Sequence, residues 1–265
     1  MNNNQSHIGK VILAAAGCGD PELITIKAAK YLQQADVVLT DRLVSEAIIK
    51  DYCNSKANII YVGKQNNNAA SYNQQQINDL LVKYAVQGKL VVRLKGGDIA
   101  FFSNVLDELE TLVHHQIPYQ IIPGITAASG AAAYAGLPLT ARGYASAVRM
   151  LTYYKQTQFS ANMWADLAAT DDTLVFYMSS ENVVDIVKNL VLNQIQSDKL
   201  LAIVQQATTM FQQVDVYNLY HFDATFTADV LASPTLLIVG RVVALHQKFN
   251  WIEANKNSQA YFNPL

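Results

Sequence analysis

The chain has 265 residues, of which 51% are hydrophobic and 15% charged, so it can bury one large core or two modest ones, and intrinsic disorder is excluded as its main state. Its 19 Lys and Arg nearly balance its 21 Asp and Glu, which excludes a global basic field for nucleic acid. There is no apolar run of the ~18 residues that a membrane helix needs, no signal-peptide pattern and no C-x-x-C spacing, so we expect a cytoplasmic protein without nucleic-acid or membrane partners.

The first half of the chain alternates strand and helix patterns. Continuous apolar runs predict buried strands over 10–16, 36–40, 57–62, 89–94 and 119–123. Apolar residues at helical spacing predict helices from Pro21, with Asp20 as its cap, and over 45–53, 73–87 and about 104–115. Strands that alternate with helices predict a parallel sheet covered on both faces.

The second half follows a cluster of Gly and Pro at 136–143, which places a domain boundary near residue 140. The strand-like segments AVRMLTY, TLVFYM, LLAIVQ and TLLIVG then recur, and the segment 212–220 has no obvious helix before it, so part of this sheet is expected to be antiparallel. The sequence therefore predicts an α/β fold with an N-terminal domain over 9–140, mostly parallel, and a C-terminal domain with a mixed sheet over 141–253. Residues 1–8 and 254–265 are expected to be tails.

Two glycine loops follow buried strands. Gly17 and Gly19 precede a helix, an arrangement that suits an anionic ligand, although a tight turn alone fits them equally well. Pro21 and Glu22 stand where a dinucleotide fingerprint needs its third Gly, and no P-loop motif occurs. The second loop, Gly96-Gly97-Asp98, follows the strand over 89–94, where ligands bind in open α/β sheets; a glycine turn with an exposed Asp is the alternative.

Other candidates are weaker when taken singly. Pro123 and Gly124 end a strand before a helix from Thr126 that is dense in small residues, which suits either a flat ligand or tight packing on the sheet. Asp41 and Lys64 each follow a strand, where a base and a cation can face one ligand, although simple rim charges have the same pattern. The adjacent pair His114-His115 lacks metal-ligand spacing, and no G-x-S-x-G occurs, so neither a zinc site nor a serine hydrolase is expected.

Several blocks in register, GCGDPELITIKA, ADVVLTDRLVS, IIYVGK, VVRLKGGD, IPYQIIPGITAASGAAAYAGLPLT, TLVFYM and SPTLLIVGRVVAL, resemble the tetrapyrrole methylases over roughly 9–251. The resemblance implies a two-domain α/β fold with S-adenosylmethionine in the cleft between the domains, S-adenosylhomocysteine as product, no metal, and usually a homodimer. It also implies two successive methyl transfers to pyrrole carbons of uroporphyrinogen III, which give precorrin-2 for siroheme or cobalamin.

Residue by residue, the resemblance places the family's cofactor contacts on Cys18, Gly96, Gly97, Asp98, Phe101, Thr126, Ala127, Met178 and Ala207. It places the proton acceptor on Asp41 and the proton donor on Lys64. Because the implied substrate carries many carboxylates, we expect a basic rim of Arg42, Lys64, Lys95, Arg142 and Arg149 despite the net charge of −2.

The chain departs from the family pattern mainly on the substrate side. Ala15 and Cys18 replace a Gly and a Pro of the first glycine loop, and Asn104 replaces an Arg. Gln65 begins a stretch that is commonly basic, Ala141 replaces a His, and the pair at 153–154 is Tyr-Tyr instead of Gly-His. Three alternatives therefore stay open: a sister methyltransferase for a later corrin precursor, a methylase of ribosomal RNA or protein, and a non-catalytic protein that binds S-adenosylmethionine or a porphyrin.

Overall fold

The computed structural model describes residues 8–63, 72–154, 159–252 and 261–262. The chain divides into two compact units, one running to Thr126 and including Phe262, the other spanning Ala127–Tyr261. The division falls before helix α5 (Ala127–Tyr134) instead of near residue 140, where the Gly and Pro cluster had placed it. The reason is that the alanines of α5 pack against the second unit's sheet, so the cluster follows a helix of that unit.

The first unit contains a five-stranded, wholly parallel sheet in the order β3-β2-β4-β1-β5, as the alternating pattern predicted. Its strands are β1 (Lys10–Ala15), β2 (Val37–Thr40), β3 (Asn58–Tyr61), β4 (Leu90–Lys95) and β5 (Tyr119–Ile122). Because all five strands run the same way, their carboxyl ends meet at one edge of the sheet. The glycine loops predicted as ligand sites follow β1 and β4 at this edge.

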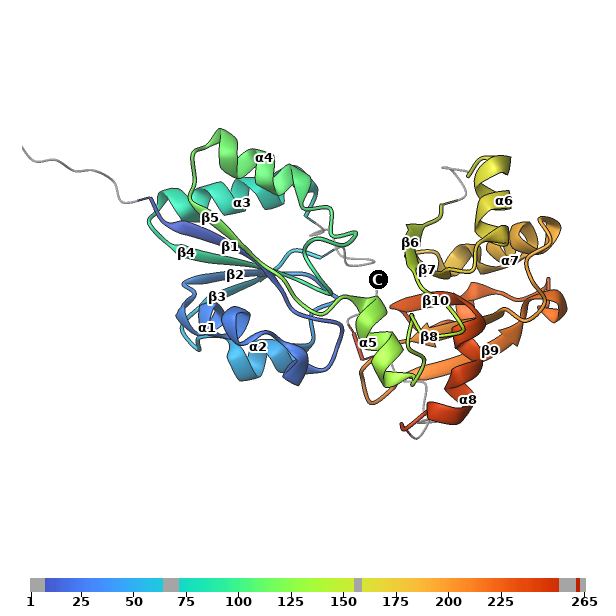
Figure 1. The fold of residues 1–265 in the computed structure, drawn as a ribbon. Helices are drawn as coiled ribbons and strands as arrows, with labels where there is room; N and C mark the ends of the chain where they lie inside the picture. The colour runs from blue at the N-terminus through green and yellow to red at the C-terminus, as the bar shows by residue number, and fades with distance from the viewer. Residues whose placement is uncertain (1–7, 64–71, 155–158, 253–260, 263–265) are drawn as a thin grey trace, which may run out of the picture. The chain divides into compact units, whose positions relative to one another are not determined.

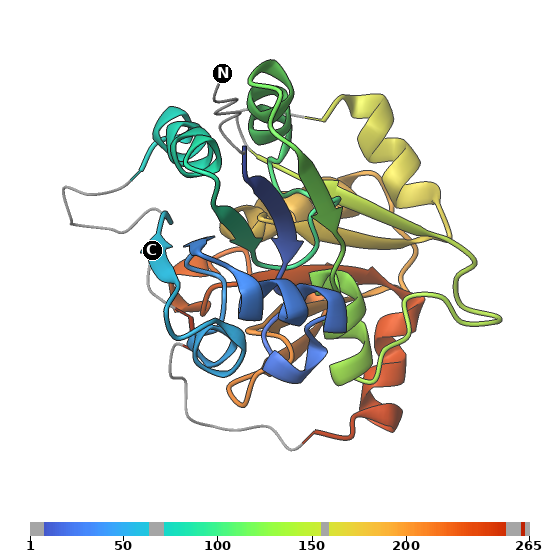
Figure 2. The same cartoon turned by 90° about the vertical axis from the view of Figure 1, so that its left-hand side faces the viewer.

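Helices cover both faces of this sheet (Figures 1 and 2). The first pair, α1 (Ile26–Gln34) and α2 (Glu46–Tyr52), packs on one face, and the second pair, α3 (Gln74–Val86) and α4 (Leu106–His114), packs on the other. Side chains alternate along a strand, so Val92 and Leu94 of β4 join the α1 and α2 side, whereas Val91 joins the α3 and α4 side.

The predicted helix from Pro21 is divided into two pieces. Asp20 caps a short 3₁₀ turn, Pro21–Leu23, and α1 begins only at Ile26, after Thr25 accepts a hydrogen bond from the Ala28 N–H. The two capping residues thus start two separate helical segments. Each side chain accepts a hydrogen bond from an N–H group that would bind a backbone carbonyl in a continuous helix.

The second unit contains a mixed sheet in the order β6-β7-β10-β8-β9. Its strands are β6 (Val148–Thr152), β7 (Thr173–Tyr177), β8 (Leu200–Gln205), β9 (Gln213–Asn218) and β10 (Thr235–Gly240). β6 and β7 are parallel, β10 is antiparallel to β7 and β8, and β9 is antiparallel to β8, which confirms the predicted antiparallel part.

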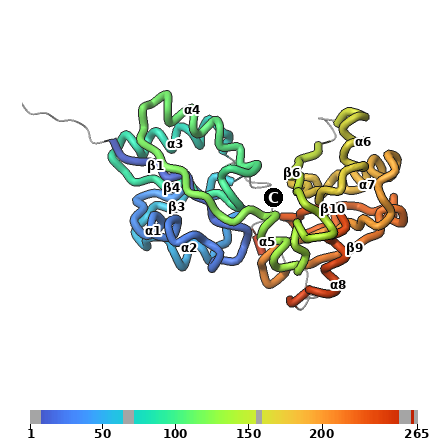
Figure 3. Tube along the Cα trace, in the orientation of Figure 1, coloured from blue at the N-terminus to red at the C-terminus, as the bar shows by residue number. Residues whose placement is uncertain are grey.

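Helix α5 packs on one face of this sheet, and α6 (Ala161–Ala169) and α7 (Val183–Leu192) pack on the other. Figure 3 follows the chain from β5 through α5 into β6, and past β10 into α8 (His246–Phe249). Of the two explanations for the small residues after Thr126, packing on the sheet therefore accounts for Ala128, Ala131 and Ala132.

Candidate functional site

Backbone hydrogen bonds between Gly17 and Gly97 connect the two glycine loops at the carboxyl edge of the first sheet. The Gly17 N–H donates to the Gly97 carbonyl at 3.1 Å, and the Gly97 N–H donates to the Gly17 carbonyl at 2.6 Å. Both residues have left-handed φ angles, 81° and 73°, which glycine adopts without a steric penalty. Apart from Gly97 and its two chain neighbours, no described residue has a heavy atom within 4 Å of where a Cβ on Gly97 would stand, so the peptide has one face without a covering side chain.

Asp98 connects the loop after β4 to the turn after β5 through a side-chain hydrogen bond. It is buried; its Oδ1 accepts from the Ala100 N–H at 2.7 Å and its Oδ2 from the Gly124 N–H at 2.6 Å. The exposed aspartate considered from the sequence is therefore not found, and the carboxylate orders two loops. Gly124 must lack a side chain, because a Cβ there would lie 2.5 Å from the Ala15 Cβ and 2.9 Å from the Gly97 carbonyl oxygen.

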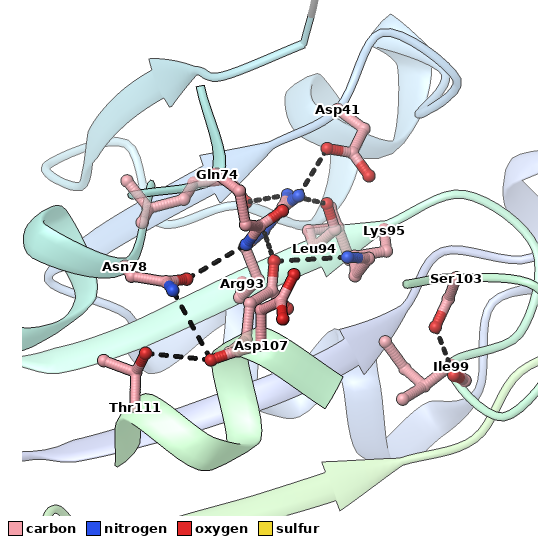
Figure 4. Close-up of polar contacts among 12 residues, drawn as sticks. Asp41, Gln74, Asn78, Arg93, Leu94, Lys95, Ile99, Ser103, Asp107 and Thr111 are labelled. Atoms are coloured by element: carbon pink, nitrogen blue, oxygen red, sulfur yellow. Dashed lines mark hydrogen bonds and ion pairs between the residues drawn. The ribbon is translucent and has the colours of Figure 1, made fainter. Parts of the chain in front are cut away.

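Asp41, the predicted proton acceptor, is bound by Arg93, a residue that no motif in the sequence indicated as part of the site. Arg93 donates from Nη2 to Asp41 Oδ1 at 2.6 Å, and Figure 4 shows the guanidinium of Arg93 pointing toward Asp41. The Arg93 side chain is 3% exposed, whereas that of Asp41 is 26% exposed. Burial opposes the charge on Arg93, but Asp41 and Glu108 outweigh it and raise the pKa of the guanidinium.

Lys95, predicted on the substrate rim, points into the same buried cluster. Its Nζ lies 3.2 Å from Glu108 Oε1, and its side chain is 7% exposed. Burial and the neighbouring Arg93 lower the pKa of Lys95. The expected exposed cation is thus not found, because residues 93 and 95 of a strand share one face and here that face is covered by α4, which supplies Glu108. That alternation was visible in the sequence.

The remaining first-unit candidates lie around the glycine loops. Cys18 and Thr126 are buried, Phe101 is exposed, and burial lowers the pKa of the half-buried Arg42 despite the opposing effect of Asp41. Asn104, at a substituted motif position, has a left-handed φ of 55°. Lys64 and Gln65 lie outside the described residues, so the predicted proton donor has no structural description.

The second unit places Met178 and Ala207 at one edge of its sheet. β7 and β8 are both antiparallel to β10, so they end at the same edge, and these two residues follow soon after them. Met178 is 52% exposed with a φ of 50°, and the neighbours of Ala207 are also left-handed, with φ of 46° at Gln206 and 67° at Thr208. Such strained non-glycine residues concentrate at functional sites.

Arg142 and Arg149 lie toward the opposite edge of this sheet. Arg149 bonds Asp166, Asp172 and Thr170, and the two carboxylates raise its pKa. Arg142 lines an open hollow of about 570 Å³ with Asp171 and Arg241, which stand before β7 and after β10. Within this unit, the sheet therefore separates the two predicted substrate arginines from Met178 and Ala207, and they do not form one rim.

Among the described residues, no group of three or more His, Cys, Asp or Glu side chains is arranged to hold a metal ion. No helix in the same part of the chain is long and apolar enough to cross a membrane.

Comparison with known proteins gives a consistent result. The chain is 46% identical over 246 residues to the siroheme synthase of Stutzerimonas stutzeri strain A1501, covering 93% of this chain but 52% of that protein, so it spans about half of such relatives. It superimposes with a TM-score of 0.72 and 32% identity on a Thermus thermophilus uroporphyrin-III C-methyltransferase complexed with S-adenosyl homocysteine, covering 89% of this chain and 100% of that one. A cobalt precorrin-4 methyltransferase, 25% identical, gives 0.77 over 88% and 95% of the two chains. Residues 10–223 match the family model described as Tetrapyrrole (Corrin/Porphyrin) Methylases, and the chain belongs to this family.

Proposed function

We propose that the chain transfers methyl groups from S-adenosylmethionine to two pyrrole carbons of uroporphyrinogen III, giving precorrin-2 for siroheme or cobalamin. The observation that carries the proposal is the bare peptide at Gly97, fixed by the Gly17 bridge and by Asp98 at the edge where α/β sheets bind ligands. The similarity to a methyltransferase complexed with S-adenosyl homocysteine supports it.

The residues present fit an adenosyl group. A flat ligand needs an unobstructed surface, and the open side of Gly97 offers one where a side chain would otherwise stand. Cys18, Gly96, Gly97 and the exposed ring of Phe101 would hold the cofactor in this unit. When bound, the cofactor supplies a methyl group already activated by the sulfonium, so the protein's main task is to orient the reacting carbon and exclude water.

Asp41 is the carboxylate proposed to face the reacting ring. Methylation leaves positive charge on the pyrrole system, and a fixed carboxylate near that charge stabilises it. The methylated carbon carries a side chain and no hydrogen, so the proton that the carboxylate accepts comes from another position of the ring system, and its loss neutralises the charge. Because Arg93 binds Oδ1 and the side chain stays 26% exposed, Asp41 is held in one orientation while part of it remains accessible. Lys64 keeps its proposed role as proton donor, and Arg42 is proposed to pair with a substrate carboxylate.

The second-unit assignments stay proposals. Ala127, Met178 and Ala207 are proposed cofactor contacts, and the left-handed backbone around Met178 and Ala207 supports a binding role. Arg142 and Arg149 are weaker substrate candidates, and Arg149 already binds two carboxylates of its own unit. We further propose a cytoplasmic homodimer that needs no metal, to be checked by light scattering and by turnover in a chelator.

A sister activity on a later corrin precursor is the second candidate. The cobalt precorrin-4 methyltransferase matches with a TM-score of 0.77, so the shared fold does not separate the two substrates. Asn104 stands where an arginine was expected to meet substrate, which favours a changed substrate.

The deciding experiment is anaerobic turnover of the purified chain with S-adenosylmethionine and enzymatically made uroporphyrinogen III, followed by mass spectrometry. We expect a product with two added methyl groups and a large loss of turnover in Asp41→Asn. Methylation of a later precorrin alone would establish the second candidate. Binding of S-adenosylhomocysteine without turnover of any tetrapyrrole would indicate a non-catalytic protein.

A further inference from the structure

Glu108 belongs to a group of four charged side chains, of which Glu108, Arg93 and Lys95 are buried and Asp41 is partly exposed. Its Oε1 is bound by Arg93 Nε at 3.0 Å and by Lys95 Nζ at 3.2 Å, and its side chain is fully buried. Arg93 continues to Asp41, and its Nη1 also donates to the carbonyls of Leu39 and Leu94, at the ends of β2 and β4. One acidic residue of α4 thus fixes the guanidinium that holds Asp41.

This arrangement is poorly suited to a purely structural role. Glu108 Oε2 is buried without a hydrogen-bond partner among the described residues, and such an atom lowers stability. A buried ion pair is in general no more stabilising than apolar residues of the same volume. Glu108 therefore lowers stability while it binds the two cations next to the partly exposed Asp41. A residue that is kept at such a cost points to a requirement of the reaction.

We propose that Glu108 is a positioning residue for methyl transfer, which acts by fixing Arg93 and, through it, the carboxylate of Asp41. Arg93 has donors on two sides, so its Glu108 contact determines how the opposite end of the guanidinium meets Asp41. Lys95 balances the second negative charge of the group. The inference rests on the proposed function, because it needs Asp41 to act on the substrate.

The test compares Glu108→Gln with Glu110→Gln, which removes the same charge from an exposed position of α4. We expect Glu108→Gln to lower kcat on uroporphyrinogen III by about 10- to 100-fold, since small displacements of a catalytic group have effects of this size. The KM for S-adenosylmethionine and the Kd of S-adenosylhomocysteine should stay unchanged, and Glu110→Gln should behave as the wild type. Combined with Asp41→Asn, Glu108→Gln should add little further loss, because both act on one carboxylate.

A second readout does not depend on turnover. The Arg93 Nε–H, assigned by its absence in Arg93→Lys, should give a solvent-protected ¹⁵N resonance that shifts in Glu108→Gln and not in Glu110→Gln. If Glu108→Gln does not fold, Lys95→Met/Glu108→Gln restores charge balance and should fold with the same loss of kcat. A wild-type kcat in Glu108→Gln or in Lys95→Met/Glu108→Gln would overturn the positioning role of Glu108 and leave the proposed function intact. Full additivity of Glu108→Gln with Asp41→Asn would do the same. Failure of the wild type to methylate any tetrapyrrole would instead overturn the proposed function, and the positioning role with it.

Discussion

Arg93→Met offers a direct measure of how much the buried charges contribute to stability. The change keeps an apolar stem of similar length but removes the guanidinium that binds Asp41 and Glu108. Glu108 is then left fully buried, with Lys95 as its one charged partner among the described residues. Removing one member of a buried ion pair typically costs about 3–5 kcal/mol, because the partner's charge is left uncompensated. We expect a loss of this size in the free energy of unfolding.

Arg149→Met is the matched control. Arg149 also binds two carboxylates, Asp166 and Asp172, but its side chain is 33% exposed and the carboxylate of Asp166 is 62% exposed. Water screens such pairs, which contribute about 0–1 kcal/mol each. The two variants therefore differ mainly in burial, and the first should lose several times more stability than the second.

Urea unfolding followed by two probes measures both losses. Circular dichroism reports on both units, whereas both tryptophans, Trp164 and Trp251, lie in the second unit and their fluorescence reports on that unit. We expect Arg93→Met to lower the stability measured by circular dichroism and Arg149→Met to change either signal little. If Arg93→Met and Arg149→Met lose the same free energy of unfolding, burial does not explain the loss in Arg93→Met.

Three further outcomes follow from the geometry. Burial and the hydrogen bond to Asp185 raise the pKa of Tyr153 to about 12 from 10.0, so the folded state keeps a proton that the unfolded chain loses. The free energy of unfolding should therefore fall between these pH values, and Tyr153→Phe should flatten that fall in urea titrations at several pH values; equal slopes would contradict it. Gly124→Ala places a Cβ 2.5 Å from the Ala15 Cβ and should lower the free energy of unfolding by about 1–3 kcal/mol. Adding Ala15→Gly should recover part of that loss in thermal unfolding, whereas an unchanged melting temperature of Gly124→Ala would show that the turn relaxes freely. Asn104→Arg should cost about 1–2 kcal/mol, because its φ of 55° suits Asn better than Arg, and it should raise kcat/KM if a substrate anchor was lost; a variant as stable as the wild type would disprove the strained loop.

Much of the fold could be predicted because its strands are uninterrupted apolar runs. β1 and β4 are buried on both faces between helix pairs, and this burial explains why their sequences lack polar alternation. The antiparallel β9 was also predictable, since no helix precedes it to make a parallel crossover. The unit boundary was not, because α5 is dense in small residues and nothing in its local pattern says on which sheet it packs.

The site was only partly predictable for a related reason. Motif position predicted that Asp41 and Asp98 lie at the carboxyl edge, and the structure places them there. It did not predict the groups that bind their carboxylates, the Arg93 guanidinium and the Gly124 N–H. Lys95 was expected in solvent, and its burial depends on Glu108, a residue of a separate helix whose contact is set by tertiary packing. Arg93 and Lys95 share one face of a strand, a pattern visible in the sequence, yet their acidic partner could be identified only from the fold.

The two hydrogen bonds of Asp98 and the Gly17–Gly97 bridge have a consequence for protein engineering. The bridge connects the loops after β1 and β4, and the Asp98 bond to the Gly124 N–H connects the loops after β4 and β5, although these loops are far apart in the chain. A chimera that imports one of these loops from a relative must keep the hydrogen bonds that this loop shares with its neighbours. Transplanting a new ligand preference into this scaffold is therefore simplest when all three loops are exchanged as a set.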